Sequence, residues 1–190
     1  MSVIDFVSQK GKMMATEKGL IHVYYGDGKG KTTAGTGLCV RAAGCGKKVL
    51  IFQFLKDNSS GECRIFTEMP GVVLMEGMSD VKFTFNMTKD ELKTISEFYT
   101  NKFQEVCFKA AEGDYDVLFL DEILHVIRKD LLPEAIVLDF LKHKPEKLEV
   151  IMTGYDPSPA LLEMADYVTH MVKEKHPYDK GIPARVGIEC

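Results

Sequence analysis

The stretch LIHVYYGDGKGKTT, residues 20–33, joins an apolar run to a glycine-rich turn that ends in a lysine and two threonines. The apolar run at 20–25 predicts a buried strand. Glycines allow backbone N–H groups to turn toward phosphate oxygens, and a helix starting at Thr32 adds the positive end of its dipole. The stretch therefore predicts a strand, a phosphate-binding loop and a helix, which together begin an α/β nucleotide-binding domain.

The loop itself supplies most of the residues expected to bind ATP. These are Gly26, Asp27, Gly28, Lys29, Gly30, Lys31, Thr32 and Thr33. Lys31 brings a positive charge, and the Thr32 hydroxyl is placed for Mg²⁺ or Mn²⁺. The usual template G-x-x-x-x-G-K-[ST] would have its first glycine at position 25, where this chain has Tyr25, so the loop is one residue short. The alternative is an incidental glycine turn before a helix, but strand, glycines, Lys-Thr and helix all fall in order and favour phosphate binding.

A second element, VLFLDE at residues 117–122, is an apolar run that ends in two carboxylates, Asp121 and Glu122. At the carboxyl end of a parallel strand they would lie near the phosphate loop, where ligands bind in such sheets. Either could hold Mg²⁺ directly or through water. The alternative is a helix N-terminus, which also favours acidic residues. With the loop present, the metal-binding interpretation is preferred, with Glu122 at the ion and Asp121 supporting the loop from behind.

Apolar runs alternate with helical patterns along the rest of the chain. Further strands are expected at 48–55, 72–76, 116–120, 148–153 and 167–172, and helices at 32–43, 88–112, 133–142 and 158–165. The helix from 88 opens with Thr88 and Glu91 in the capping-box spacing. Near-continuous apolar strands separated by helices predict a mostly parallel sheet of about six strands with helices on both faces. This is the P-loop NTPase-like (RecA-like) class of α/β fold.

The chain shows no internal repeat or low-complexity linker, so residues 18–190 are interpreted as one domain. Residues 1–17 form an N-terminal extension with loosely spaced apolar residues. They are either a helix that docks on this subunit or a neighbour, or a frayed tail.

Composition excludes several classes of protein. The net charge of −4 has the wrong sign for binding to nucleic acid through phosphate neutralisation. Five cysteines without a CxxC pair argue against a disulfide framework and a zinc site. No apolar stretch approaches the roughly 20 residues that span a bilayer, and the N-terminus lacks the pattern of a signal peptide. We therefore expect a soluble, cytoplasmic protein without membrane or nucleic-acid partners.

Several segments, in order, resemble the ATP:corrinoid adenosyltransferases (cob(I)alamin adenosyltransferases) of the phosphate-loop type. The segments are GDGKGKTT at 26–33, RAAGCGKKVLIFQFLK at 41–56 with GE at 61–62, LDE at 120–122, KHPYDKG at 175–181 and GIE at 187–189. That family's loop has the same shortened form. The resemblance covers about residues 18–190, and its specificity comes from the order of the segments.

The resemblance implies transfer of the 5′-deoxyadenosyl group of ATP to the Co(I) centre of cobalamin or a precursor, with release of triphosphate. It implies Lys31 and Glu122 as catalytic residues and Mg²⁺ at Thr32, Glu122 and Asp121. It also implies a homodimer and a flavin-type reductase as electron donor. Such a reaction needs charge neutralisation and alignment more than acid–base groups, so the lack of a Ser-His-Asp or Cys-His constellation is consistent with it.

The remaining assignments concern the segment at 83–85, His176 and Tyr155. Phe83 and Phe85 stand where the family often has F-T-W, which implies rings that face the corrinoid; the alternative is core residues of an edge strand. His176 either helps to close the C-terminal segment over the nucleotide or caps a turn before Pro177. Tyr155 stands where the family commonly has the arginine of T-G-R, so this chain departs from the family pattern there.

Two other functions use the same loop. A small-molecule kinase or ATPase would release ADP, whereas an adenosyltransferase releases triphosphate. A nucleotide-dependent binding protein would bind ATP without forming any corrinoid product.

Overall fold

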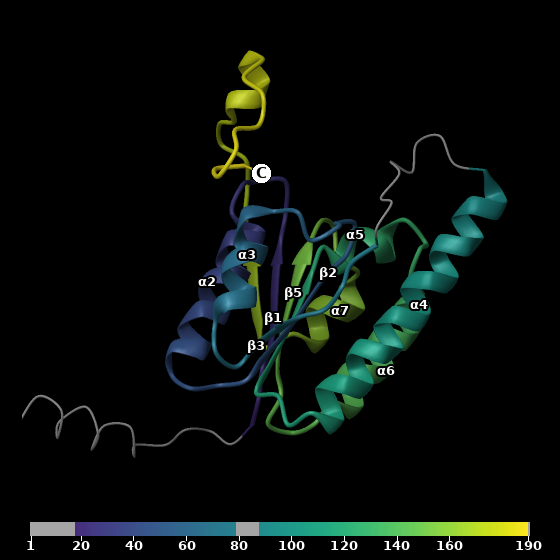
Figure 1. Ribbon diagram of the computed structural model, residues 1–190. Helices are drawn as coiled ribbons and strands as arrows, with labels where there is room; N and C mark the ends of the chain where they lie inside the picture. The colour runs from purple at the N-terminus through teal and green to yellow at the C-terminus, as the bar shows by residue number, and fades with distance from the viewer. Residues whose placement is uncertain (1–17, 79–87, 190) are drawn as a thin grey trace, which may run out of the picture.

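The computed structural model describes residues 18–78 and 88–189 of the 190-residue chain. Figure 1 shows a sheet whose strands run in one direction, with helices packed beside it and the C-terminal segment rising beyond the carboxyl ends of the strands. The expectations for residues 1–17 and for Phe83 and Phe85 lie outside the described residues.

The described part of the chain forms one sheet of six parallel strands in the order β3-β2-β4-β5-β1-β6. The strands are β1 (Ile21–Tyr25), β2 (Val49–Gln53), β3 (Val72–Leu74), β4 (Val117–Asp121), β5 (Glu149–Gly154) and β6 (Tyr167–His170). The helices are α2 (Lys31–Gly44), α3 (Gly61–Glu68), α4 (Lys89–Glu112), α5 (Ile123–Arg128), α6 (Glu134–His143) and α7 (Pro159–Met164), with a short 3₁₀ helix η2 (Pro177–Lys180). The predicted mostly parallel α/β sheet is confirmed.

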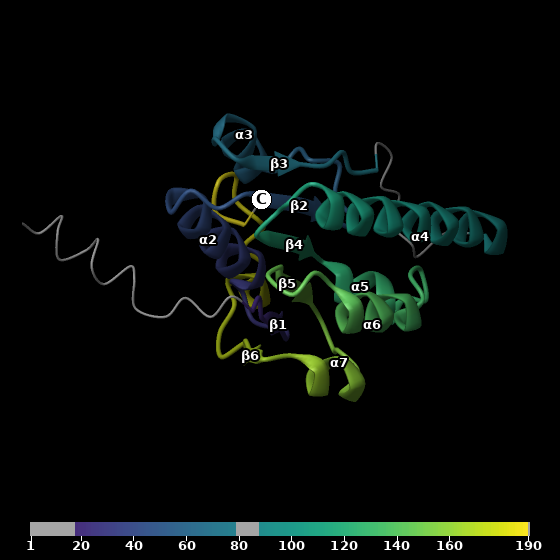
Figure 2. The same ribbon diagram turned by 90° about the horizontal axis from the view of Figure 1, so that it is seen from below.

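The two faces of the sheet are covered by different helices, as Figure 2 shows. Successive residues of a strand point to opposite faces. In β2, Leu50 and Phe52 belong to the larger core, under α4, α5, α6 and α7. Val49 and Ile51 belong to the smaller core, under α2 and α3. Because both faces are covered, the central strands are apolar at nearly every position, which is why they could be found as continuous runs in the sequence.

The strand order decides where the site lies. Strand β1 leads into the glycine-rich loop, β4 ends in the acidic pair, and β5 lies between them, paired with both. From β1 the chain crosses over β5 and β4 to reach β2, whereas from β4 it returns in the opposite direction to β5. The connections that follow β1 and β4 therefore run in opposite directions along the sheet. A crevice at the carboxyl ends of the strands forms at such a point and is where open α/β sheets bind ligands.

The predicted long helix is confirmed, and Thr88 and Glu91 form the expected capping box. The helices α3 and α5 were not predicted. With eight and six residues, they are too short to show a helical period in sequence. The last strand is shorter than predicted, since β6 pairs with β1 only over Tyr167–His170. Among the described residues no helix combines the length and the apolar character that a membrane crossing requires.

Helix α2, which carries the loop, packs closely on β4 through Gly35. A Cβ atom built on Gly35 would lie 2.4 Å from the Phe119 ring, closer than real Cβ contacts come. Gly37, two residues along the same helix, has no heavy atom within 4 Å of such a Cβ. The missing side chain at Gly35 thus sets the distance between the helix that begins at the loop and the strand that ends in the acidic pair.

We predict opposite effects for the same substitution at these two glycines. Gly37→Ala should raise the free energy of unfolding by up to about 1 kcal/mol, because alanine is the better helix former. Gly35→Ala should lower it by roughly 1–3 kcal/mol, because the added methyl overpacks Phe119. Urea unfolding of both variants measures the difference. If Gly35→Ala were as stable as Gly37→Ala, this close packing would not constrain the fold.

Candidate nucleotide-binding site

The loop leaves β1 in a conformation that only glycine adopts easily. Gly26 and Gly30 have positive φ values of 121° and 115°. Gly30 is also the N-cap of α2, and no side chain caps the helix there. The first-turn amides of α2 therefore need other acceptors, and anions bind well at such helix N-termini.

The residues that follow β6, 171–189 (the C-terminal segment), also hold the loop in place. The Gly28 amide donates to the Met171 carbonyl at 2.8 Å, and the Met171 amide donates to the Tyr25 carbonyl at 2.7 Å. The Lys173 amide donates to Asp27 Oδ1 at 3.0 Å and lowers the pKa of that carboxyl group. The loop is thus fixed by the residues that follow the edge strand β6, far away in sequence.

Lys31 lies folded over the loop. Its Nζ donates to the Gly28 carbonyl at 2.7 Å, and both residues line the same cavity. Because the Gly28 carbonyl carries no net charge, the positive charge of Lys31 can still attract an anion that enters the cavity.

Asp121 is the buried centre of the site. Its side chain is 0% exposed and accepts hydrogen bonds at both oxygens. Oδ1 accepts from the hydroxyls of Thr153 at 2.6 Å and Thr32 at 2.9 Å. Oδ2 accepts from Lys56 Nζ at 2.8 Å and Gln53 Nε2 at 3.2 Å. The carboxylate thereby joins the first turn of α2 to β5, to β2 and to the loop that follows β2.

Lys56 reaches Asp121 from a tightly shaped loop. Leu55 and Asn58, on either side of it, have positive φ values of 56° and 63°, a conformation that costs free energy in residues other than glycine. The Tyr99 hydroxyl accepts from the Leu55 amide at 3.1 Å and helps to hold this shape. Burial would lower the pKa of Lys56, but the charge and hydrogen bond of Asp121, with the charges of Glu62 and Glu122, raise it on balance. Lys56 therefore remains positively charged beside the buried carboxylate.

Glu122 faces the cavity, whereas Asp121 lies behind it. The Glu122 amide donates to Thr153 Oγ1 at 2.9 Å, and the Glu122 carboxylate is hydrogen-bonded to His125. Burial would raise the pKa of Glu122, but the His125 hydrogen bond and the charges of His125, Lys56 and Lys31 lower it on balance. Glu122 also has a positive φ of 62°, which turns the chain from β4 into α5. The result is an ionised carboxylate at the edge of the phosphate loop.

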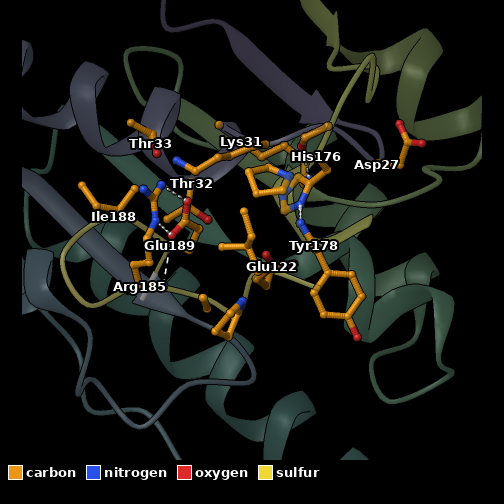
Figure 3. Close-up of a pocket in the computed structure, with 17 residues that line it drawn as sticks. Asp27, Lys31, Thr32, Thr33, Glu122, His176, Tyr178, Arg185, Ile188 and Glu189 are labelled. Carbon is orange, nitrogen blue, oxygen red and sulfur yellow. Dashed lines mark hydrogen bonds and ion pairs between the residues drawn. The ribbon is translucent and has the colours of Figure 1, made fainter. Parts of the chain in front are cut away.

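A cavity of about 320 Å³ brings these groups together, and Figure 3 shows its lining. Residues 27–33 form one wall, Glu122 lies at another side, and the C-terminal segment supplies the rest, including His176, Arg185 and Glu189. This volume is at the lower end of the range for small-molecule sites.

Most of the predicted site residues meet at this cavity. Asp27, Gly28, Lys29, Gly30, Lys31, Thr32, Thr33, Glu122 and His176 line it. Gly26 lies at the end of β1 just before the loop, and Asp121 is buried behind Thr32. His176 also caps η2, since its Nδ1 accepts from the Tyr178 amide at 3.2 Å. Its expected part in closing the segment over a nucleotide stays a prediction.

Some residues of the site were not assigned a role from sequence. Gln53 and Lys56 lie within the segment quoted for the family resemblance, and that resemblance is the signal that could have singled them out. Glu189 ends the GIE segment, which gives a similar signal. Thr153 is the threonine of the T-G-R pattern, which is the signal that could have singled it out. Arg185 carried no such signal, because its place depends on how distant segments meet.

The oxygen groups at the cavity suit a hard cation such as Mg²⁺. Thr32 offers a hydroxyl, Glu122 offers an ionised carboxylate, and Asp121 holds Thr32 in place. Among residues 18–78 and 88–189 there is no group of three or more His, Cys, Asp or Glu that could hold a metal ion by itself. An ion here would complete its coordination with phosphate oxygens and water, as Mg²⁺ does in other nucleotide sites.

Position 155, where the resemblance leads us to expect arginine, carries a tyrosine that contacts an arginine from another element. The Tyr155 ring stacks on His125, with centroids 6.3 Å apart. The guanidinium carbon of Arg128 lies 5.1 Å from the Tyr155 ring centroid. A cation is therefore present beside this position, although it comes from α5.

Comparisons with known proteins agree on one family. The family model for "ATP:corrinoid adenosyltransferase BtuR/CobO/CobP" matches residues 17–190. The corrinoid adenosyltransferase of Escherichia coli K12 is 34% identical over 173 residues, covering 91% of this chain and 86% of that protein. Corrinoid adenosyltransferase CobA of Salmonella typhimurium LT2 is 32% identical over 187 residues, covering 98% and 93%. The corrinoid adenosyltransferase of a Sinorhizobium species is 36% identical over 185 residues, covering 94% and 85%.

Among solved structures, ATPases 2 and 3 of EssC from Geobacillus thermodenitrificans align with a TM-score of 0.47 and 13% identity, over 92% of this chain and 36% of that chain. This likeness is too low to identify a family. The sequence matches, by contrast, span nearly all of the chain and include the loop and the acidic strand end. The chain belongs to the ATP:corrinoid adenosyltransferase BtuR/CobO/CobP family.

Proposed function

We propose that this protein transfers the 5′-deoxyadenosyl group of ATP to the Co(I) centre of a corrinoid, either cobalamin or a precursor, and releases triphosphate. The observation that carries the proposal is the cavity where the phosphate loop, Lys31 and Glu122 meet, in a chain that belongs to this family. Family membership over residues 17–190 also supports the proposal that residues 18–190 form the catalytic domain.

The proposed reaction is a displacement at the 5′ carbon of ATP. The electron pair of Co(I) forms the Co–C bond while the C5′–O bond breaks. The electrons of the broken bond stay on the α-phosphate oxygen, so the triphosphate leaves with one more negative charge, and cobalt is formally oxidised to Co(III). No proton is transferred, so the protein's task is to align the carbon and to stabilise the leaving anion.

The residues around the cavity provide this stabilisation. The first-turn amides of α2 and the Lys31 ammonium would bind phosphate oxygens. Mg²⁺, when bound at Thr32 and Glu122, would neutralise part of the triphosphate charge. Asp121 keeps the Thr32 hydroxyl oriented through its 2.9 Å hydrogen bond. His176 and the rest of the C-terminal lining would limit the access of water to the reacting groups.

Several further parts of the proposal rest on the resemblance. They are Phe83 and Phe85 as residues that face the corrinoid, a flavin-type reductase as electron donor and a homodimer. Mg²⁺ as the metal rests also on Thr32 and the acidic pair, and a cytoplasmic location rests on composition. A kinase or ATPase, or a nucleotide-dependent binding protein, could use the same loop. The family match favours adenosyl transfer over both.

The proposal is tested by mixing the protein with Mg-ATP and chemically reduced cobalamin and following the absorption spectrum of the Co–C product. We expect the wild-type protein to form this product. Lys31→Ala should reduce turnover at saturating ATP by about 10²–10³-fold, because a charge that stabilises the leaving group is lost. Its Tm should stay close to that of wild type, since the hydrogen bond that Lys31 makes among the described residues goes to a neutral carbonyl.

Lys47→Ala is the control, because Lys47 is an exposed lysine at a surface ion pair with Asp116. It should keep wild-type turnover. Near-normal turnover of a folded Lys31→Ala variant would contradict the role proposed for the loop. Absence of the Co–C product with the wild-type protein would contradict the proposed function itself.

The two neighbouring carboxylates should give different results. Glu122→Gln should raise the Mg²⁺ concentration needed for half-maximal activity by about tenfold, because Glu122 faces the cavity. Asp121→Asn should change this requirement less, but should lower the free energy of unfolding by roughly 3 kcal/mol or more, because it breaks a buried charge pair.

A Mg²⁺ titration of activity, combined with urea unfolding, separates the two effects. Glu163→Gln, an exposed carboxylate of α7, is the charge-matched control and should change neither. A larger Mg²⁺ requirement for Asp121→Asn than for Glu122→Gln would show that the two roles are assigned the wrong way round.

A further inference from the structure

The C-terminal segment contributes an arginine–glutamate pair to the lining of the cavity. Arg185 Nη2 donates to Glu189 Oε1 at 2.8 Å, and Arg185 Nε donates to Oε2 of the same carboxylate at 3.1 Å. The Arg185 amide also donates to Oε2, at 3.0 Å. Figure 3 shows this pair in the lining of the cavity, which Thr32 of the phosphate loop also lines.

The two partners differ in their exposure. The Arg185 side chain is 58% exposed, whereas that of Glu189 is only 16% exposed. The hydrogen bonds from Arg185, together with the charges of Arg185 and Lys29, lower the pKa of Glu189 to about 2. Glu189 is therefore an anion at neutral pH, held at the wall of a cavity whose loop is built to bind anions.

A guanidinium group binds carboxylates and phosphates in the same forked geometry. Arg185 now makes that fork with Glu189. Phosphate oxygens that enter the cavity could take the place of the carboxylate without any change in the kind of contact. The reaction proposed above adds a negative charge to the triphosphate, and a third cation beside Lys31 and the metal would stabilise it.

We propose that Arg185 binds the triphosphate group and that Glu189 is its placeholder, which holds the guanidinium at the cavity until phosphate oxygens displace the carboxylate. The proposal rests on the proposed function only in taking the ligand to be the triphosphate of ATP. It gives the C-terminal segment a direct part in binding, beyond covering the loop.

A purely structural role is the alternative. The amides of Ile188 and Glu189 both donate to the Arg185 carbonyl, at 3.1 and 3.0 Å, so the pair could simply stabilise this turn. The two roles predict opposite effects on triphosphate binding when the Glu189 carboxylate is removed. If the carboxylate is a placeholder, it competes with phosphate for Arg185, and its loss strengthens triphosphate binding. If the carboxylate is a structural partner, its loss disturbs the turn and weakens binding.

The test is calorimetric titration of the full-length protein with inorganic triphosphate and Mg²⁺, without corrinoid. We expect Arg185→Gln to weaken binding by about 10- to 100-fold, because charge-assisted hydrogen bonds to phosphate are lost. Arg185→Lys keeps the charge but loses the fork and should lie in between. Glu189→Gln should tighten binding by about threefold or more, because no carboxylate then holds Arg185 away from the ligand.

Lys180→Gln and Glu174→Gln are matched controls, since they make the same charge changes in exposed parts of the same segment outside the cavity lining. Both should bind triphosphate like wild type. Wild-type affinity in Arg185→Gln would overturn the proposal. Unchanged or weaker binding in Glu189→Gln would overturn the placeholder role.

The outcome is independent of adenosyl transfer. If the expected order of affinities were found but no Co–C product formed with reduced cobalamin, the binding role of Arg185 would stand and the proposed function would fail.

Discussion

The buried carboxylate of Asp121 is the interaction on which the site depends. A carboxylate removed from water is costly unless its oxygens are hydrogen-bonded and its charge is balanced. Here Thr32, Thr153 and Gln53 supply hydrogen bonds and Lys56 supplies both a hydrogen bond and the balancing charge. Each donor comes from a different element, so α2, β5, β2 and the loop after β2 must all be in place together. The same contacts fix the Thr32 hydroxyl at the start of the phosphate-binding helix.

The cavity in front of Asp121 is lined on one side by the chain that follows the edge strand β6. Its lining carries positive groups from two parts of the chain, Lys31 of the loop and Arg185 of the C-terminal segment, together with the carboxylate of Glu122. A chemical step without proton transfer needs such an arrangement of fixed charge more than it needs an acid or a base. This agrees with a site in which the titratable groups are paired with one another: Glu122 with His125, and Arg185 with Glu189.

Much of this structure could be predicted from the sequence because its signals are local. The glycines, Lys31 and Thr32 follow one another in a few residues, and the strand 117–121 is apolar until its carboxylates. Contacts that depend on strand order could not be predicted. Thr153 meets Asp121 because β5 pairs beside β4, and Arg185 reaches the cavity because the chain after β6 turns back over the loop. The helices α3 and α5 are too short for their periodicity to be read.

The identity of the leaving group tests the central claim most directly, since it reports which bond of ATP is broken. The protein, Mg-ATP and chemically reduced cobalamin would be allowed to react, and the phosphorus products would be resolved by ³¹P NMR. Our account predicts inorganic triphosphate in an amount equal to the Co–C product, because the C5′–O bond breaks. ADP as the product, with or without a phosphorylated acceptor, would show attack at the γ-phosphate and would contradict the account.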